Sequence, residues 1–205
     1  MTDKFIFENN ISLDMVLGYL GIDESNHGRY PEIFVGIFST ISKDKRKSEF
    51  PKIRRKIRSI QKEISDNNLE RDYRFVSIPE EYSEYLTRDQ LALVAMSELI
   101  VFHDIPSNVS GSTLDTVLID GNRSCSEVDK IKEIIYPHKP KINCVPKGDK
   151  LYRVVNLADL TANALFREYS STKPKKTLED CFQDKQLIPK LEEYIDFFRQ
   201  DRKIY

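Results

Sequence analysis

Three apolar stretches of this 205-residue sequence are each followed by carboxylates. Asp23 and Glu24 follow LGYLGI, Asp120 follows TVLI, and Asp149 comes just after KINCVPKG. Sites in open α/β sheets form at the carboxyl ends of the strands, so these acids could converge. Crowded carboxylates raise one another's pKa unless a divalent cation neutralises them. Oxygen ligands without His or Cys favour Mg²⁺ or Mn²⁺ over zinc.

Such a cluster predicts metal-dependent hydrolysis of phosphodiester bonds. Two ions about 4 Å apart can hold the attacking and leaving oxygens of an in-line displacement. For any one acid taken alone, an ordinary turn at the end of a strand is an equally good explanation. Adjacent residues of a regular strand point to opposite faces, so Asp23 and Glu24 can bind the same metal only if the strand breaks between them.

The acids need a sheet to bring them together, and the apolar pattern predicts one. Strands are expected where apolar residues run continuously or alternate, and helices where they recur every three or four residues. The expected strands cover 17–23, 32–41, 73–78, 116–120 and 141–145, and the expected helices cover 50–64, 91–102, 126–135, 153–169 and 187–198. The polar turn over 24–31 leaves no room for a helix and joins the first two strands as a hairpin. We therefore expect an α/β fold with a ribonuclease H-like, mixed five-stranded sheet flanked by helices and a C-terminal helical extension.

Length and composition bound the classes of protein. We expect one ribonuclease H-like domain over residues 1–169, followed by a linker and a C-terminal helix over 170–205. The longest apolar run is too short to cross a bilayer, and the first residues lack the pattern of a signal peptide. The three cysteines show no CxxC spacing, which argues against a disulfide framework and a zinc site. These patterns predict a cytoplasmic protein with no membrane partner.

The formal net charge of −1 conceals a basic segment. Residues 43–62 include ten Lys and Arg residues and only two acids. A nucleic-acid backbone would favour such a segment through release of counterions, although a solvated helix face is the usual explanation of a charge run. Within it, Lys43, Lys45 and Arg46 are the candidates for contact with phosphates.

Three motifs resemble those of type 2 ribonuclease H (ribonuclease HII). GIDESNHG (21–28) resembles the GxDExGRG motif of that family, VLIDGNR (117–123) its second acidic strand, and PKGDK (146–150) its KGD segment. The stretch 77–99 is similar to the helical region before the second acidic strand. The resemblance implies an endonuclease that depends on Mg²⁺ or Mn²⁺ and cuts RNA in RNA–DNA hybrids or related duplexes. It also implies four metal ligands: Asp23, Glu24, Asp120 and Asp149.

The sequence departs from that family at the GRG element, in the late helix and after Tyr169, where the family's downstream Gly-Tyr and His segment is not recognisable. Asn26 and His27 replace the Gly and Arg of the GRG element, of which Gly28 is retained, so these three positions are the candidate contacts to the substrate. His27 could also move a proton near the attacking water, although a histidine in a polar turn is more often simply exposed. The helix over 156–169 lacks the small-residue pattern of the family and carries Asp159.

Asp159 also connects the sequence to a second group. The DES strand end and the late ADxxA helix resemble the pattern of the DUF3800 family, another ribonuclease H-like group, and by that resemblance Asp159 is the last ligand. A favourable charge near the start of a helix explains Asp159 equally well. Three hypotheses follow: a ribonuclease HII-like nuclease, a DUF3800-like protein that acts on another nucleic acid, and a nucleic-acid-binding module without catalysis.

Overall fold

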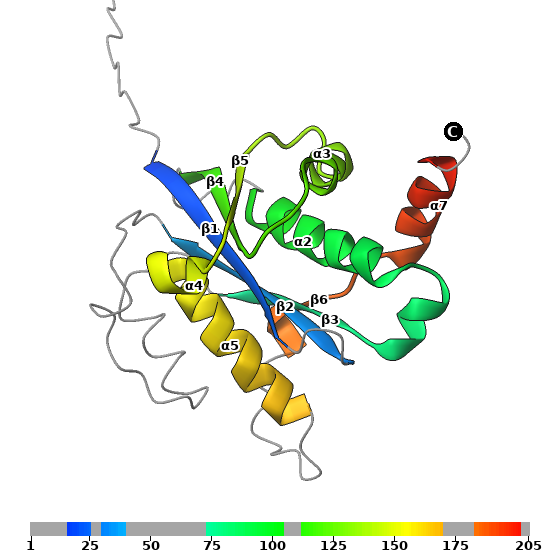
Figure 1. Ribbon diagram of the computed structural model, residues 1–205, viewed down its shortest axis with the longest axis horizontal. Helices are drawn as coiled ribbons and strands as arrows, with labels where there is room; N and C mark the ends of the chain where they lie inside the picture. Colours follow the sequence, from blue (N-terminus) through cyan, green and yellow to red (C-terminus); the bar gives the residue numbers. More distant parts are fainter. Residues whose placement is uncertain (1–15, 26–29, 40–72, 105–111, 170–182, 202–205) are drawn as a thin grey trace, which may run out of the picture.

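The computed structural model describes residues 16–25, 30–39, 73–104, 112–169 and 183–201 (Figure 1). The strands are β1 (Val16–Ser25), β2 (Glu32–Ser39), β3 (Arg74–Ile78), β4 (Ser112–Asp120), β5 (Lys141–Val145) and β6 (Gln186–Leu187). The helices are η2 (Glu80–Glu84), α2 (Arg88–Asp104), α3 (Cys125–Ile134), α4 (Gly148–Leu151), α5 (Arg153–Tyr169), η3 (Gln183–Lys185) and α7 (Leu191–Asp201). The predicted helix over 50–64 lies outside the described residues.

The strands form one sheet in the order β5-β4-β1-β2-β3-β6. The first hairpin is antiparallel, and β3 also runs antiparallel to β2. β4 and β5 then join on the other side of β1, both parallel to their neighbours. The expected mixed α/β fold is thereby confirmed, and the carboxyl ends of β1, β4 and β5 lie at the same edge of the sheet.

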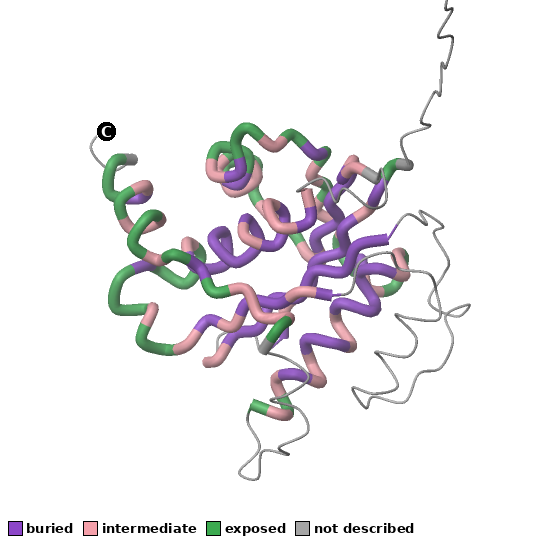
Figure 2. Tube along the Cα trace, turned by 180° about the vertical axis from the view of Figure 1, so that it is seen from behind, coloured by how far each residue is buried: buried purple, intermediate pink, exposed green. Residues whose placement is uncertain are grey.

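α2 covers one face of the sheet. α2 is buried on nearly all sides, as expected for a helix enclosed between a sheet and other helices. Phe34 and Phe38 of β2 point to this side together with Leu20 and Ile22 of β1, and all four belong to the larger core cluster. In Figure 2 the buried residues are concentrated in the central strands and in α2.

α5 covers the opposite face and crosses β1 and β2 (Figure 1). Its buried residues pack on Ile33, Val35 and Ile37 of β2 in a second core cluster. The approach is close because β1 has a glycine there: a Cβ on Gly21 would lie 2.5 Å from the carbonyl carbon of Val154. The absence of a side chain at Gly21 thus allows the backbone of α5 to lie directly on β1.

The C-terminal part of the described chain adds one strand more than expected. β6 is two residues long and pairs with β3, so the sheet has six strands rather than five. A strand this short carries no alternating pattern, which is why sequence analysis missed it. The amphipathic α7 follows and buries Phe198 against the core on the α2 side. The division of the chain at residue 169 stays a prediction.

Among the described residues, no helix combines the length and the apolar character that crossing a membrane would need.

Candidate carboxylate site

β1 places Asp23 and Glu24 on opposite faces of the sheet. The strand continues without a break through Ser25, with Asp23 opposite Val35 and Glu24 opposite Phe34 in β2. Directly opposed residues share a face. Since Val35 packs under α5 and Phe34 packs under α2, Asp23 faces α5 and Glu24 faces α2. The break that would bring both carboxylates to one metal does not occur in this structure.

Asp120 ends β4 on the same side as Asp23. Ile22 of β1 pairs with Ile119 of β4, and both belong to the core under α2, so the next residue of each strand points to the α5 side. The backbone N–H groups of Gly148 and Asp149 point at Oδ1 of Asp120, with a short hydrogen bond from Gly148. A Cβ on Gly148 would lie 3.2 Å from that oxygen, which explains why a glycine suits this position.

Asp159 lies in α5 and acts on the same group of acids. Its carboxylate oxygen Oδ1 accepts a hydrogen bond of 2.6 Å from the Asn163 side chain, one turn further along the helix. The same Asn163 nitrogen also donates to the backbone carbonyl of Asp159. This pair of hydrogen bonds fixes the orientation of the Asp159 side chain, which is partly exposed.

Asp23 is the electrostatic centre of the cluster. Its side chain is buried, and burial raises the pKa of the carboxyl from 3.8 to about 9, with further contributions from the negative charges of Asp120 and Asp159. Glu24 contributes least to this rise, although it is the next residue in the chain. The backbone N–H of Glu24 donates to Asp23 Oδ1 at 2.8 Å and opposes the rise. Without a cation, Asp23 therefore holds its proton at neutral pH.

Glu24 has a different environment on the α2 side. Its Oε1 lies 3.4 Å from Nη2 of Arg123, a residue of the loop between β4 and α3. Both side chains are largely buried, at 16% and 17% exposure. The guanidinium thus supplies a positive charge near Glu24, whereas the charges that raise the pKa of Asp23 are carboxylates.

Asp149 is placed beside the cluster through its backbone. It lies in α4, the single helical turn after β5, and its N–H points at Asp120 Oδ1 at 3.4 Å. The carboxylates that contribute most to the raised pKa of Asp23 are those of Asp120 and Asp159. The structure therefore brings Asp23, Asp120 and Asp159 into electrostatic contact.

The donor chemistry of these three acids fits a hard divalent cation. All three offer carboxylate oxygens, and the repulsion at Asp23 is the kind that such an ion relieves. Within the described residues, however, no three His, Cys, Asp or Glu side chains are positioned as a ready-made group of metal ligands.

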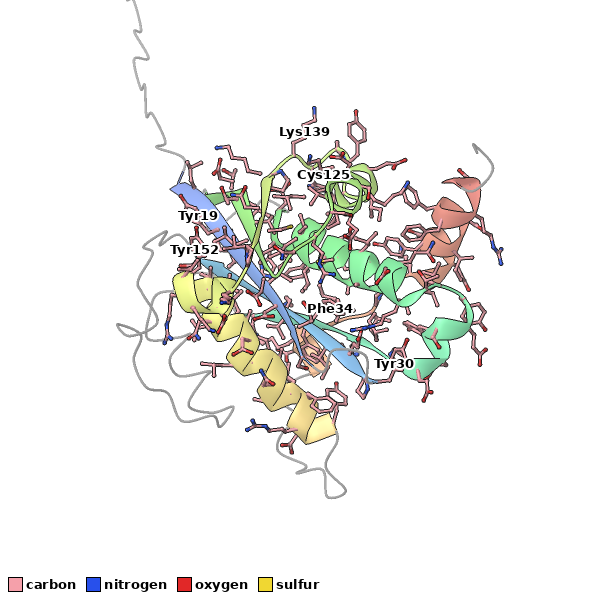
Figure 3. The ribbon with its side chains drawn as sticks, in the orientation of Figure 1. Tyr19, Tyr30, Phe34, Cys125, Lys139 and Tyr152 are labelled. Carbon is pink, nitrogen blue, oxygen red and sulfur yellow. The ribbon has the colours of Figure 1, made fainter. Side chains whose placement is uncertain are left out.

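Six predicted substrate contacts lie outside the described residues: Asn26, His27, Gly28, Lys43, Lys45 and Arg46. The sequence patterns predict no role for Arg123 or Asn163. Arg123 had a detectable signal, because Glu127 follows it at the spacing of an ion pair on a helix. In Figure 3, Cys125 marks the start of α3 and Tyr152 the junction of α4 and α5, on opposite sides of β1 in this view.

Solved structures identify the fold. A mutant of Bst-RNase HIII matches with a TM-score of 0.50 and 14% sequence identity, over 82% of this chain and 56% of that chain. A chain of the PCNA:RNase HII complex from Archaeoglobus fulgidus matches with a TM-score of 0.50 and 13% identity, over 80% of this chain and 74% of that chain. The fold is ribonuclease H-like.

The likeness is one of fold. This ribonuclease H-like chain spans little more than half the length of the Bst-RNase HIII chain that it matches. No protein-family model matches the sequence, and no curated protein matches it.

Proposed function

We propose that this protein is a metal-dependent nuclease that hydrolyses phosphodiester bonds. Its active site would be formed by Asp23, Asp120 and Asp159. One observation carries the proposal. A buried aspartate at the end of a central strand is repelled by two other aspartates, one from the parallel neighbouring strand and one from the helix above it. Crowded acids with a strongly raised pKa are typical of functional sites.

The three aspartates would hold Mg²⁺ or Mn²⁺. When bound, the cation would polarise the phosphate and lower the pKa of a water molecule. The chain's own groups prepare this site: Asn163 orients Asp159, and the backbone N–H groups of Gly148 and Asp149 orient Asp120. Asp149 itself is the alternative to Asp159 as a ligand, as the resemblance to ribonuclease HII implies.

The proposed substrate is the RNA strand of an RNA–DNA hybrid or a related duplex. Support comes from the motif resemblance and from the ribonuclease H-like fold of the chain. The basic segment over residues 43–62 would contact the phosphates.

A second candidate keeps the chemistry and changes the substrate. The position of Asp159 near Asp23 favours it, because an aspartate of the late ADxxA helix is the feature shared with the DUF3800 pattern. In this case another RNA or DNA would be cleaved, and RNA–DNA hybrids would not be preferred.

The test is cleavage of a panel of labelled substrates by the full chain with Mg²⁺ or Mn²⁺. The panel contains an RNA–DNA hybrid, a duplex with one ribonucleotide, duplex DNA and single-stranded RNA. Loss of a residue that merely orients a metal ligand typically lowers metal affinity or activity by about 10–100-fold. Because Asp120 is a proposed ligand itself, Asp120→Asn should lower the cleavage rate by at least about 100-fold. Asp129→Asn is the matched control, because Asp129 is exposed on α3 and pairs only with the exposed Lys132 among the contacts described.

The outcomes separate the hypotheses. If the protein cleaves hybrids and Asp159→Asn abolishes this cleavage while Asp149→Asn does not, Asp159 is the third ligand. Cleavage of other substrates alone would support the second candidate. Salt-sensitive binding to nucleic acid with no cleavage of any substrate would contradict catalysis and leave a binding module.

A further inference from the structure

The Arg123 side chain, in the loop that follows Asp120, connects β1 to α3. Its Nη2 lies 3.4 Å from Glu24 Oε1 in β1, and its Nη1 lies 3.8 Å from Glu127 Oε1 in α3. Exposure of the Arg123 side chain is 17%, so water screens these contacts less than it screens surface ion pairs. One guanidinium thereby joins the strand that carries Asp23 to the helix that follows Asp120.

Glu127 is held in place by a second set of contacts. Its Oε2 accepts a hydrogen bond of 2.7 Å from the backbone N–H of Ser124, and the Ser124 hydroxyl accepts one from the backbone N–H of Glu127. This reciprocal pair is a capping box, which fixes the first turn of α3. Glu127 is therefore a fixed anchor for Arg123.

The remainder of the loop is tied to β5. The backbone N–H of Gly121 donates to the carbonyl of Val145 at 3.1 Å, and the Arg123 backbone hydrogen-bonds the Cys144 thiol. The loop thus has contacts with β5, α3 and β1. Arg123 supplies the contact to β1 among those described.

We propose that Glu24, Arg123 and Glu127 form a clamp that fixes the Asp120 loop against β1, and that Glu24 serves this clamp rather than the aspartate cluster. The register of β1 supports the assignment, since Glu24 and Asp23 face opposite sides of the sheet. To reach a cation bound at Asp23, Glu24 would have to leave Arg123 and open the pairing of β1 with β2 at Glu24 and Ser25. Arg123 is then a positioning residue for Asp120.

This inference rests on the proposed function only where it concerns metal binding, so the experiment has two readouts. Glu24→Gln, Arg123→Met and the double variant are compared in the full chain. The first readout is the urea midpoint of unfolding, and the second is the dissociation constant for Mn²⁺ from the electron paramagnetic resonance signal of the free ion. Lys132→Met and Asp129→Asn serve as controls, because they break an exposed pair of α3.

The clamp predicts that each single variant lowers the urea midpoint and that the double variant lowers it no further than the worse single variant. Each single variant should weaken Mn²⁺ binding by a similar factor of about ten, as expected for a residue that orients a ligand, and the double variant should add nothing. Arg123→Lys should recover part of the loss. Asp120→Asn should weaken binding by at least about 100-fold.

Two results would overturn the clamp. One is additive loss of stability in the double variant. The other is a loss of Mn²⁺ affinity in Glu24→Gln as large as in Asp120→Asn while Arg123→Met has no effect, which would make Glu24 a ligand. If the unaltered protein binds no Mn²⁺, the proposed function fails, and the stability readout alone decides whether the clamp exists.

Discussion

Asp23 and Glu24 are neighbours in sequence but occupy opposite electrostatic environments. Asp23 lies under α5, buried and repelled by Asp120 and Asp159. Glu24 lies under α2, where the Arg123 guanidinium is 3.4 Å away. The sheet separates the two carboxylates because successive side chains of a strand point to opposite faces.

The difference shows how one strand can carry both a destabilised group and a stabilising one. Burial of the Asp23 carboxyl, together with repulsion by Asp120 and Asp159, costs folding free energy that a cation or a proton relieves. At Glu24 the Arg123 guanidinium offsets part of the cost of burying the carboxylate. A buried and repelled carboxyl such as that of Asp23 is typical of functional sites. An ion pair such as Glu24–Arg123 supports the surrounding structure.

The largest expected effect on the free energy of unfolding comes from a substitution that adds a side chain between β1 and α5. Gly21→Ala places a methyl group 2.5 Å from the α5 backbone at Val154, which cannot move as a side-chain end can. We expect a loss of about 4 kcal/mol in the free energy of unfolding, measured by urea denaturation. Gly36→Ala is the control on the α2 side, where the nearest atoms at 3.2 Å belong to the side chains of Leu20 and Leu99. An equal loss for both variants would contradict the close contact of α5 with β1.

Removing the charge of Asp23 and removing the charge of Glu24 should change the free energy of unfolding in opposite directions. Asp23→Asn should stabilise the metal-free protein by about 2–4 kcal/mol at pH 7, because it removes a carboxyl that must hold a proton well above its ordinary pKa. Glu24→Gln should destabilise it by about 1 kcal/mol, because the Arg123 charge loses a partner. Urea midpoints of the two variants test this, and a shift in the same direction for both would contradict the comparison.

The stabilisation by Asp23→Asn should depend on pH. The pKa of Asp23 rises from 3.8 to about 9 on folding. Between these values the folded protein holds a proton that the unfolded chain releases, so Asp23 lowers stability progressively as pH increases. The gain from Asp23→Asn should be near zero at pH 4 and should level off above pH 9.

Metal binding should stabilise the folded protein in turn. Mn²⁺ at ten times its dissociation constant should raise the free energy of unfolding of the unaltered protein by about 1.4 kcal/mol, measured by urea denaturation.

A smaller effect is expected at the base of the clamp. Ser124→Ala removes the hydroxyl of the capping box and should cost about 1 kcal/mol of stability. If Glu127 anchors Arg123, this variant should also reduce the non-additivity between Glu24→Gln and Arg123→Met. A loss of stability with unchanged non-additivity would make the capping box independent of the clamp.

The smallest effect is expected far from the acids on the α2 side. The Tyr194 hydroxyl of α7 donates to Glu98 Oε1 of α2 at 2.7 Å, and burial together with this hydrogen bond raises the pKa of Tyr194. Tyr194→Phe should cost about 0.5–1 kcal/mol without changing Mn²⁺ binding or cleavage. A change in either would mean that α7 affects the aspartate cluster.

The sequence by itself determined the mixed α/β fold and the strands that end in acids. Continuous apolar stretches such as 116–120 indicate buried strands, and a turn too short for a helix requires an antiparallel start. β5 and α5 have the bounds that the pattern predicted. These features depend on residues close in the chain, so local spacing is enough to find them.

Only the tertiary structure decided which acids meet. The unbroken pairing of β1 and β2 separates Glu24 from Asp23, and the absence of a side chain at Gly21 lets α5 bring Asp159 near Asp23. Both outcomes depend on packing between segments distant in sequence, which no local pattern encodes. Electrostatic interaction is set by distance and burial in space, so the environment of each carboxylate followed from the fold and not from its position in the motif.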